Sequence, residues 1–284
     1  MSAPHVPPIN APPDLLAAIV DAVRQELSVS ELRRPRRLVE ADAAEREPRG
    51  DAFRAGLVVA DRINVIAECK QRSPSRGILR QEYAPSVIAK GYDSAGAAAV
   101  SVLTEPAFFD GDLEHLEQVR DVVDLPVLRK DFIVTEYQLV ETRAAGADAA
   151  LLIVAALDDL ELRSLLKVSR SLGLAALVEV HDERQLVRAL EAEAEVIGVN
   201  NRNLRTLEVE LDASFELVSQ IPDSVVAIAE SGIRSSADLV TLRSVGYDAF
   251  LVGEALMSRA DPGVELRAML EGAGQVSRPP RQDH

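Results

Sequence analysis

Short runs of apolar residues alternate with longer amphipathic segments from about residue 60 onward. Eight of these runs are almost free of polar interruption, which is typical of parallel strands buried on both faces. The runs cover residues 64–70, 98–103, 127–130, 149–154, 174–179, 196–200, 225–230 and 249–252. The pattern therefore predicts eight buried strands separated by helices.

Glycines stand just before several of the predicted strands. Gly96, Gly146, Gly173 and Gly246 each occupy a position where glycine would cap the preceding helix. Their spacings are close to multiples of about 25 residues, which one strand, one loop and one helix would fill. Eight such units predict an α/β fold, a (β/α)8 TIM barrel. An open doubly wound sheet is disfavoured, because the first turn lacks the Gly-x-Gly-x-x-Gly fingerprint of dinucleotide-binding folds.

A separate helical pattern precedes the first strand. Apolar residues recur at helical spacing from Leu16 to Leu27, behind the candidate cap Asp14. We expect an extra N-terminal helix that covers one end of the barrel, within a single domain formed by residues 14–272. Residues 1–13 and 273–284 are polar or rich in proline and have no evident apolar surface to bury, so we expect both to be mobile tails.

Composition and charge exclude several classes of protein. The chain has 31 Lys and Arg against 46 Asp and Glu, a formal charge of −15 that disfavours nucleic acid as a partner. The single cysteine, Cys69, cannot form an intrachain disulfide, and no Cys/His set has the spacing of zinc ligands. No secretion signal is visible, and the longest apolar run, residues 149–157, is far shorter than the roughly 20 residues of a membrane helix. We expect a metal-free, cytoplasmic protein that binds neither nucleic acid nor membrane.

Polar and charged side chains nevertheless end five of the predicted strands. They are Glu68, Lys70, Lys130, Glu179, Asn200 and Ser231. The carboxyl ends of barrel strands meet at one mouth, where the active sites of this fold lie. Alternation along the first strand places Glu68 and Lys70 on one face and Cys69 on the other. An internal ion-pair network is the alternative, but buried pairs seldom stabilise more than apolar residues of equal volume, so a ligand site is favoured.

The turns after the last two strands both contain glycine. Gly232 and Gly253 stand in Ala229-Glu230-Ser231-Gly232-Ile233 and Val252-Gly253-Glu254-Ala255-Leu256, where backbone N–H groups could approach a ligand closely. The loops after strands seven and eight, together with a short helix, are the usual phosphate site of a TIM barrel. The sequence therefore predicts a phosphate-binding end of the mouth.

Longer motifs connect these residues. They are Ile66-Ala67-Glu68-Cys69-Lys70, Ser73-Pro74-Ser75-Arg76-Gly77, Ser101-Val102-Leu103-Thr104-Glu105, Lys130-Asp131-Phe132-Ile133, Leu177-Val178-Glu179-Val180, and Gly198-Val199-Asn200-Asn201-Arg202-Asn203-Leu204. With the Ala229–Ile233 turn, they resemble the indole-3-glycerol phosphate synthase family of tryptophan biosynthesis over about residues 14 to 270. The resemblance implies a carboxy-lyase that needs no cofactor or metal. It would close 1-(2-carboxyphenylamino)-1-deoxyribulose 5-phosphate into a pyrrole ring with loss of carbon dioxide and water.

The resemblance also implies roles for the residues at the strand ends. Lys130 would be the general acid at the carbonyl, and Glu179 the acid/base group for proton removal and water loss. Lys70 would hold the substrate carboxylate, or share the acid role with Lys130, and Glu68 would orient Lys70. Asn200 and Ser231 would hydrogen-bond the rearranging substrate.

Further residues would surround the substrate. Ser73 and Arg202 would line the mouth, Phe109, Phe132, Leu151 and Leu204 would form the pocket for the anthranilate ring, and Gly232, Gly253 and Glu254 would bind phosphate through backbone N–H groups. Ordinary core packing is the alternative for the four apolar residues. Glu254 stands where some family members have serine, and we expect its carboxylate to turn away from the phosphate. We expect His181 to face outward.

Two other functions remain open from the sequence. The neighbouring phosphoribosylanthranilate isomerase would share the phosphate loops, but its chemistry resembles a Cys and Asp pair, whereas this chain presents two Lys and two Glu. A barrel that binds without catalysing is the second alternative. The first loop, residues 71–83, has a composition compatible with a lid. The oligomeric state is open, with a monomer as the simplest expectation.

Overall fold

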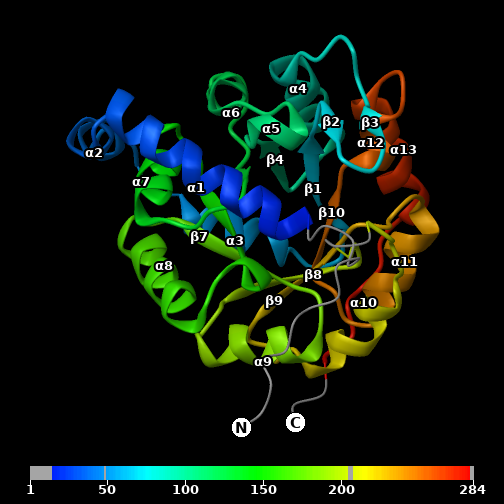
Figure 1. Cartoon of the computed structure of the whole chain (residues 1–284). Helices are drawn as coiled ribbons and strands as arrows, with labels where there is room; N and C mark the ends of the chain where they lie inside the picture. The colour runs from blue at the N-terminus through cyan, green and yellow to red at the C-terminus, as the bar shows by residue number, and fades with distance from the viewer. Residues whose placement is uncertain (1–14, 48, 204–206, 282–284) are drawn as a thin grey trace, which may run out of the picture.

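Eight parallel strands close into a barrel in the computed structural model, which describes residues 15–47, 49–203 and 207–281 (Figure 1). The strands are β1 (Asn64–Cys69), β4 (Ala99–Leu103), β5 (Val127–Lys130), β6 (Ala149–Ile153), β7 (Ala175–Val180), β8 (Val196–Asn200), β9 (Val226–Glu230) and β10 (Ala249–Val252). They follow chain order around the barrel, and β10 pairs with β1 to close it. The predicted barrel is confirmed, and every predicted strand lies within about two residues of its observed bounds.

Helices surround the barrel because each strand leaves its outward side chains to be covered. They are α4 (Pro85–Ala95), α6 (Leu113–Arg120), α7 (Glu136–Ala144), α8 (Asp159–Ser171), α9 (Glu183–Glu191), α10 (Asp212–Leu217), α11 (Ser236–Ser244) and α13 (Pro262–Ala273). Shorter helices lie at α5 (Pro106–Phe109), η1 (Val154–Ala156), η2 (Val218–Gln220) and α12 (Glu254–Met257). The four predicted capping glycines all adopt positive φ, between +70° and +118°. A left-handed residue at the C-terminal end of a helix requires such an angle.

The N-terminal segment contains three helices rather than one. They are α1 (Leu15–Arg33), α2 (Arg36–Ala44) and α3 (Gly50–Leu57). Helix α1 lies across the front of the barrel in Figure 1, where Arg24 pairs with Glu161 in the first turn of α8 at the carboxyl ends of the strands. Helix α2 packs against α7, and α3 reaches the opposite end, where the Gly50 N–H donates to the Gly173 carbonyl. The predicted helix is present, and the segment continues along the side of the barrel to its other end.

The C-terminal segment makes contacts that the sequence did not suggest. Residues 274–281 follow α13 to the amino end of the barrel, where only 1% of the Arg281 side chain is exposed. Arg281 donates to Asp248, just before β10, over 2.9 Å, and Arg278 pairs with Asp223 over 2.7 Å. We expected a mobile tail because the segment has little apolar surface. The side chain that it buries is that of Arg281. Residues 1–14, which include the predicted N-terminal tail, and residues 282–284 lie outside the described residues.

The first βα loop contains a short hairpin that the sequence did not predict. Strands β2 (Arg72–Ser73) and β3 (Gly77–Ile78) pair antiparallel, and Gly77 adopts a φ of +68° at the start of β3. After the hairpin, Arg80 donates to the carbonyl of Arg259 over 2.8 Å and also to the carbonyls of Met257 and Ala260. The base of the loop is thereby attached to the segment that follows α12.

Candidate active site

A cavity of about 420 Å³ lies at the carboxyl ends of the strands. All but two of the residues predicted for the site line it. They are Glu68, Lys70, Phe109, Lys130, Phe132, Leu151, Glu179, Asn200, Arg202, Ser231, Gly232, Gly253 and Glu254. Leu204 falls outside the described residues, and Ser73 is buried without lining the cavity; its hydroxyl contacts Ser75 and the Arg76 N–H. The predicted convergence of polar strand ends is therefore found.

Lys130 lies at the centre of the charged groups. Its Nζ is 3.0 Å from Glu179 Oε2 and 3.6 Å from Glu230 Oε2. Burial alone would lower the pKa of this lysine, but the carboxylates of Glu179, Glu230 and Glu68 outweigh burial and raise it. Lys130 therefore carries a proton throughout the neutral range.

Glu230 also belongs to this group of charged residues, although we did not predict it from the sequence. Its side chain is 1% exposed, and burial, together with Glu179 and Glu68, raises its pKa to about 8 despite the attraction of Lys130. The carboxyl occupies space left by Gly198, because a Cβ there would come within 1.9 Å of Glu230 Oε1. The signal was in the sequence, since Glu230 ends an apolar strand in the same way as Glu68 and Glu179 do. We named Ser231 for that strand and not the carboxyl before it.

Glu179 has the opposite electrostatic balance. Burial would raise its pKa, but Lys130, His181 and a hydrogen bond from Asn200 together lower it, so Glu179 is the ionised member of the pair with Glu230. His181 Nε2 lies 3.5 Å from Glu179 Oε1. Our expectation that His181 faces outward was wrong, because alternation at the end of β7 puts residues 179 and 181 on the same face.

A second lysine lies on the β1 side of the cavity. Lys70 Nζ pairs with Glu68 Oε1, and both side chains are largely buried. Gly253 leaves room for this carboxyl, since a Cβ at Gly253 would come within 2.3 Å of Glu68 Oε1. The glycine that we assigned to phosphate binding therefore also has a packing reason at its position.

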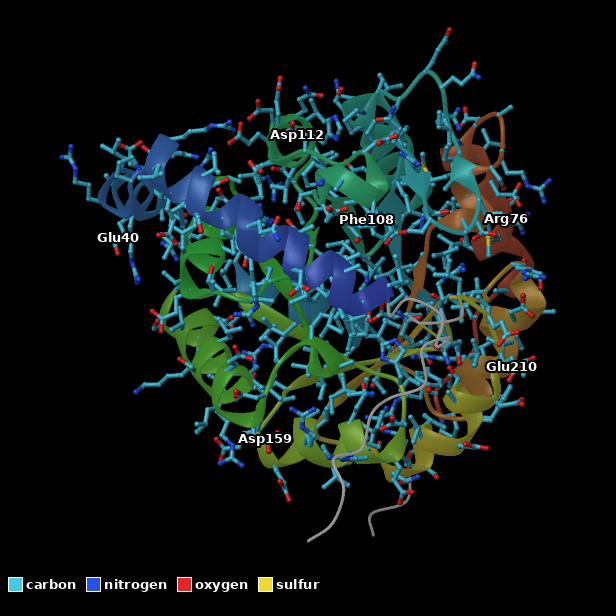
Figure 2. The ribbon with its side chains drawn as sticks, in the orientation of Figure 1. Glu40, Arg76, Phe108, Asp112, Asp159 and Glu210 are labelled. Carbon is cyan, nitrogen blue, oxygen red and sulfur yellow. The ribbon has the colours of Figure 1, made fainter. Side chains whose placement is uncertain are left out.

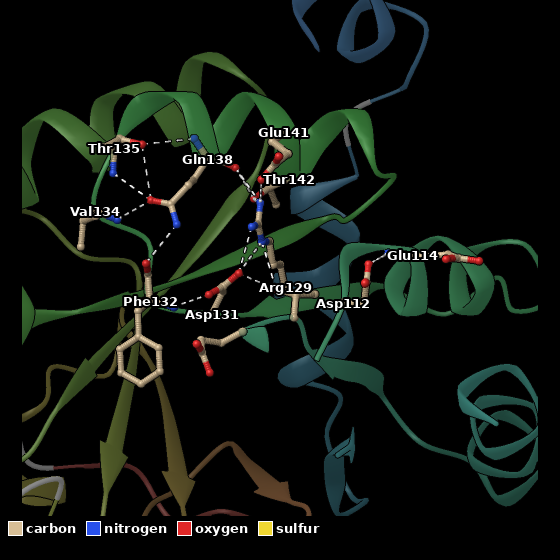
Figure 3. Close-up of polar contacts among 12 residues, drawn as sticks. Asp112, Glu114, Arg129, Asp131, Phe132, Val134, Thr135, Gln138, Glu141 and Thr142 are labelled. Atoms are coloured by element: carbon tan, nitrogen blue, oxygen red, sulfur yellow. Dashed lines mark hydrogen bonds and ion pairs between the residues drawn. The ribbon is translucent and has the colours of Figure 1, made fainter. Parts of the chain in front are cut away.

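The turn after β5 is held by a network of mostly buried polar groups (Figure 3). Arg129 donates to Asp131 Oδ2, and Asp131 Oδ1 accepts from the backbone N–H of Phe132. Gln138 in α7 then donates to the Phe132 carbonyl and accepts from the Val134 N–H. These bonds fix the backbone on which Lys130 and Phe132 stand, because each polar group of the turn has a defined partner.

One wall of the cavity is apolar. The rings of Phe109, from α5, and Phe132 lie with centroids 6.1 Å apart and tilted by 37°. Leu151 and Ile153 of β6 and Leu103 of β4 continue this wall. A flat aromatic group bound against the wall could reach the charged groups at its polar end.

The opposite end of the cavity contains the two turns predicted to bind phosphate. Ser231 and Gly232 adopt consecutive positive φ angles of 64° and 81°, which turn the chain sharply after β9. The short helix predicted after the last strand is present as α12, with Gly253 at its N-cap. Positive φ at a serine is uncommon and is often retained where a site requires it.

Glu254 lines this end of the cavity, with its carboxylate engaged by two arginines. Its Oε1 accepts from Arg76 over 3.0 Å and its Oε2 from Arg202 over 3.1 Å. Arg76 extends from the hairpin loop (Figure 2), and both arginines line the cavity. The carboxylate therefore neutralises part of the positive charge that a phosphate would meet, and it joins the loops after β1 and β8.

Some polar atoms of the site lack a hydrogen-bond partner. Glu179 Oε1, Glu230 Oε1 and His181 Nε2 are buried and have no hydrogen-bond partner within the described residues. A cavity with two lysines, four glutamates, an aromatic wall and a tight glycine turn, at the carboxyl ends of barrel strands, is typical of a (β/α)8-barrel enzyme that performs acid–base chemistry on a small molecule.

The sequence also matches a known protein family over most of its length. The model of the family "Indole-3-glycerol phosphate synthase" matches residues 16–269. The chain is 45% identical to the indole-3-glycerol phosphate synthase of Albidiferax ferrireducens, over 92% of this chain and 99% of that protein. It is 50% identical to the enzyme of the same name from Parafrankia sp., over 87% and 91%. The chain belongs to the indole-3-glycerol phosphate synthase family.

Solved structures agree on the fold. The 3-hexulose-6-phosphate synthase of Salmonella typhimurium superposes with a TM-score of 0.59 and 16% identity, over 74% of this chain and 98% of that one. The thiamine phosphate pyrophosphorylase of Pyrococcus furiosus gives a TM-score of 0.57 at 14% identity, over 75% and 96%. Within the described residues, no helix is long and apolar enough to span a membrane.

Proposed function

We propose that this chain closes 1-(2-carboxyphenylamino)-1-deoxyribulose 5-phosphate into indole-3-glycerol phosphate, with release of carbon dioxide and water. Membership of the family supports this reaction, and so does the order of groups along the cavity. An aromatic wall, a charged centre and an anion-binding turn match the aromatic ring, the reacting carbons and the phosphate of that substrate. The observation that carries the proposal is the convergence of Lys70, Lys130, Glu179 and Glu230 on one cavity.

Lys130 donates a proton to the ketone oxygen as the ring closes. Its raised pKa keeps it protonated before the substrate arrives, and the neighbouring carboxylates hold its ammonium in place. Lys70 binds the substrate carboxylate, and Glu68 orients Lys70 through their ion pair. Loss of that carboxylate as carbon dioxide then removes a negative charge close to Glu68. Removal of this repulsion favours decarboxylation over its reversal.

Glu179 supplies the proton for loss of water and removes the carbon-bound proton whose departure makes the new five-membered ring aromatic. As the ionised carboxyl of the pair it can accept that carbon-bound proton. Asn200 and Ser231 hydrogen-bond the rearranging intermediate from the ends of β8 and β9. Glu230, protonated near neutral pH, can donate a hydrogen bond from the same side.

Phe109, Phe132 and Leu151 bind the anthranilate ring, and Leu204 is assigned to the same pocket by its position in the motif. The backbone N–H groups of Gly232, Gly253 and Glu254 bind the phosphate. Arg202 lines this end of the mouth, with Ser73 in support.

We further propose that the enzyme works without cofactor or metal, in the cytoplasm, and as a monomer. The test is to mix the purified protein with the substrate in the presence of chelator and to follow the appearance of indole fluorescence. Product formation in chelator supports both the reaction and its independence of metal. A substrate that binds without turnover would favour a barrel that has lost its activity, and a substrate that fails to bind would refute the proposal.

A further inference from the structure

His181 is the titratable side chain closest to Glu179 that the proposed mechanism leaves unused. It stands between the end of β7 and the N-cap of α9, Asp182, and 14% of its side chain is exposed against 1% for Glu179. The histidine ring therefore lies between the buried carboxylate and the solvent.

The hydrogen bonds around the ring determine which nitrogen carries the proton. Gln185 Oε1 accepts from the His181 backbone N–H over 3.1 Å, and Gln185 Nε2 donates to Asp182 Oδ2 over 3.2 Å, so the orientation of this amide is fixed at both ends. The same Oε1 lies 3.3 Å from His181 Nδ1. An amide oxygen can only accept, so Nδ1 must be the protonated nitrogen of the neutral ring.

That tautomer leaves the lone pair of Nε2 facing the carboxylate. His181 Nε2 and Glu179 Oε1 are 3.5 Å apart, and both are buried atoms without another hydrogen-bond partner among the described residues. Two acceptors facing each other in a buried place repel unless a proton lies between them. The Glu179–His181 pair is therefore expected to share one proton between Oε1 and Nε2. It then carries one proton more than an ionised glutamate beside a neutral histidine.

None of the other groups around Glu179 can take that proton. Lys130 approaches the second oxygen of Glu179 and is already protonated, and Glu230 is protonated up to about pH 8. Asn200 only donates its hydrogen bond to Glu179, and Glu68 is engaged by its lysine. These are the groups that face Glu179 from β5, β9, β8 and β1.

We propose that His181 is a positioning residue that holds the proton which Glu179 delivers to the leaving hydroxyl group and later recovers. The proposal rests on the acid/base role of Glu179 in the proposed function. The stored proton moves from His181 Nε2 through Glu179 Oε1 to the hydroxyl oxygen as the carbon–oxygen bond breaks and water leaves. The electrons of the adjacent carbon–hydrogen bond then form the new double bond of the five-membered ring, and that proton passes through Glu179 back to Nε2, so the pair ends as it began. The proton that Lys130 gives to the ketone oxygen is replaced from solvent, because loss of carbon dioxide from a carboxylate consumes one proton overall.

The first test reads the tautomer directly. In wild-type protein with ¹⁵N-labelled histidine, the neutral ring of His181 should show a protonated Nδ1 and an unprotonated Nε2 in long-range ¹H–¹⁵N spectra. A neutral ring protonated on Nε2 would overturn the proposal, whatever the variants do, because that nitrogen could not accept a proton from Glu179.

The second test separates storage of a proton from packing. Glutamine at position 181 places an amide near the former Nε2 and cannot take up a proton, so His181→Gln should lower kcat by about tenfold with KM within about twofold. The pH profile of kcat should lose one ionisation. His115→Gln is the matched control, because His115 packs edge-on against Tyr83 outside this network, and it should retain the wild-type profile.

Gln185→Leu provides a second variant should His181→Gln fold poorly. It removes the acceptor that holds Nδ1–H and should lower kcat by a smaller factor, again without a matching change in KM. Wild-type kcat and an unchanged pH profile in both folded variants would refute the proposal. If Glu179→Gln is inactive in that case, the proposed function stands and only the role of His181 fails; if the wild-type protein forms no product, the proposed function itself fails.

Discussion

Replacement of Glu230 by glutamine is expected to change how stability depends on pH. The substitution keeps the shape of the side chain and fixes it in the neutral state that the folded protein favours. Burial beside Glu179 and Glu68 is what raises the pKa of Glu230 from the ordinary 4.5 to about 8. In the unfolded chain the carboxyl has lost those neighbours and titrates near its ordinary value.

The size of the effect follows from the two pKa values. A raised pKa in the folded state means that the stabilisation is fully present below pH 4.5 and is lost as the pH rises to about 8. Each pH unit in that window corresponds to about 1.4 kcal/mol for one group. The wild-type free energy of unfolding should therefore lose on the order of 5 kcal/mol through Glu230, and Glu230→Gln should lose none of it.

Urea unfolding followed by far-ultraviolet circular dichroism measures this difference, since the chain has no tryptophan. The free energy of unfolding of the variant minus that of the wild type should rise between about pH 4.5 and pH 8 and level off above that. Glu179→Gln serves as a control of opposite sign. The pKa of Glu179 is lowered, so its contribution is present above pH 4.5 and is lost as the pH falls. Parallel pH curves for wild type and Glu230→Gln would refute this account of the site.

Four further outcomes are expected. Lys130→Met should lower kcat by at least about 100-fold without unfolding the protein, measured as indole formation beside circular dichroism; unchanged turnover would remove Lys130 from the mechanism. Phe109→Leu should raise KM several-fold with little change in kcat, because it loses the aromatic contact on one wall of the cavity. Arg281→Ala should cost about 3 kcal/mol of unfolding free energy, because Asp248 loses a buried partner, and should leave kcat at 25 °C intact. Finally, kcat/KM should fall as salt is added, because Lys70, Lys130 and Arg202 line the mouth that an anionic substrate enters, and equal values at low and high salt would argue against such attraction.

The barrel was predictable because its strands are buried on both faces and its helices end in glycine. The apolar runs and the glycines can both be seen within a few residues of sequence. The first reflects burial of the strands on both faces, and the second reflects the left-handed backbone at the helix ends. The hairpin of β2 and β3 was not predictable, because two-residue strands have no periodicity to detect. Helix α3 depends on the close approach of Gly50 to the loop before β7, a tertiary contact that the sequence does not display.

The candidate site was predictable as far as it follows strand ends. Lys130 and Glu179 were found because charge at the end of an apolar strand is unusual, and the same rule applied fully would have found Glu230. His181 was misplaced because it follows the strand and was not counted in its alternation. The pairing of Glu254 with Arg76 joins residues far apart in the chain, so only the folded structure brings it into view.

The seam between β1 and β10 has a consequence for how the chain acquires its structure. Asn64 pairs with Ala249 there, so the barrel cannot close until nearly the whole chain has been synthesised. Joining strands across a loop of roughly 185 residues costs about 2 kcal/mol more in chain entropy than joining neighbours about 25 residues apart. The backbone groups at the outer edge of β1 remain without their final partners until then. We therefore expect closure of this seam to be a late step in folding, and the stretch around β1 to be the part of the nascent protein most exposed to mispairing.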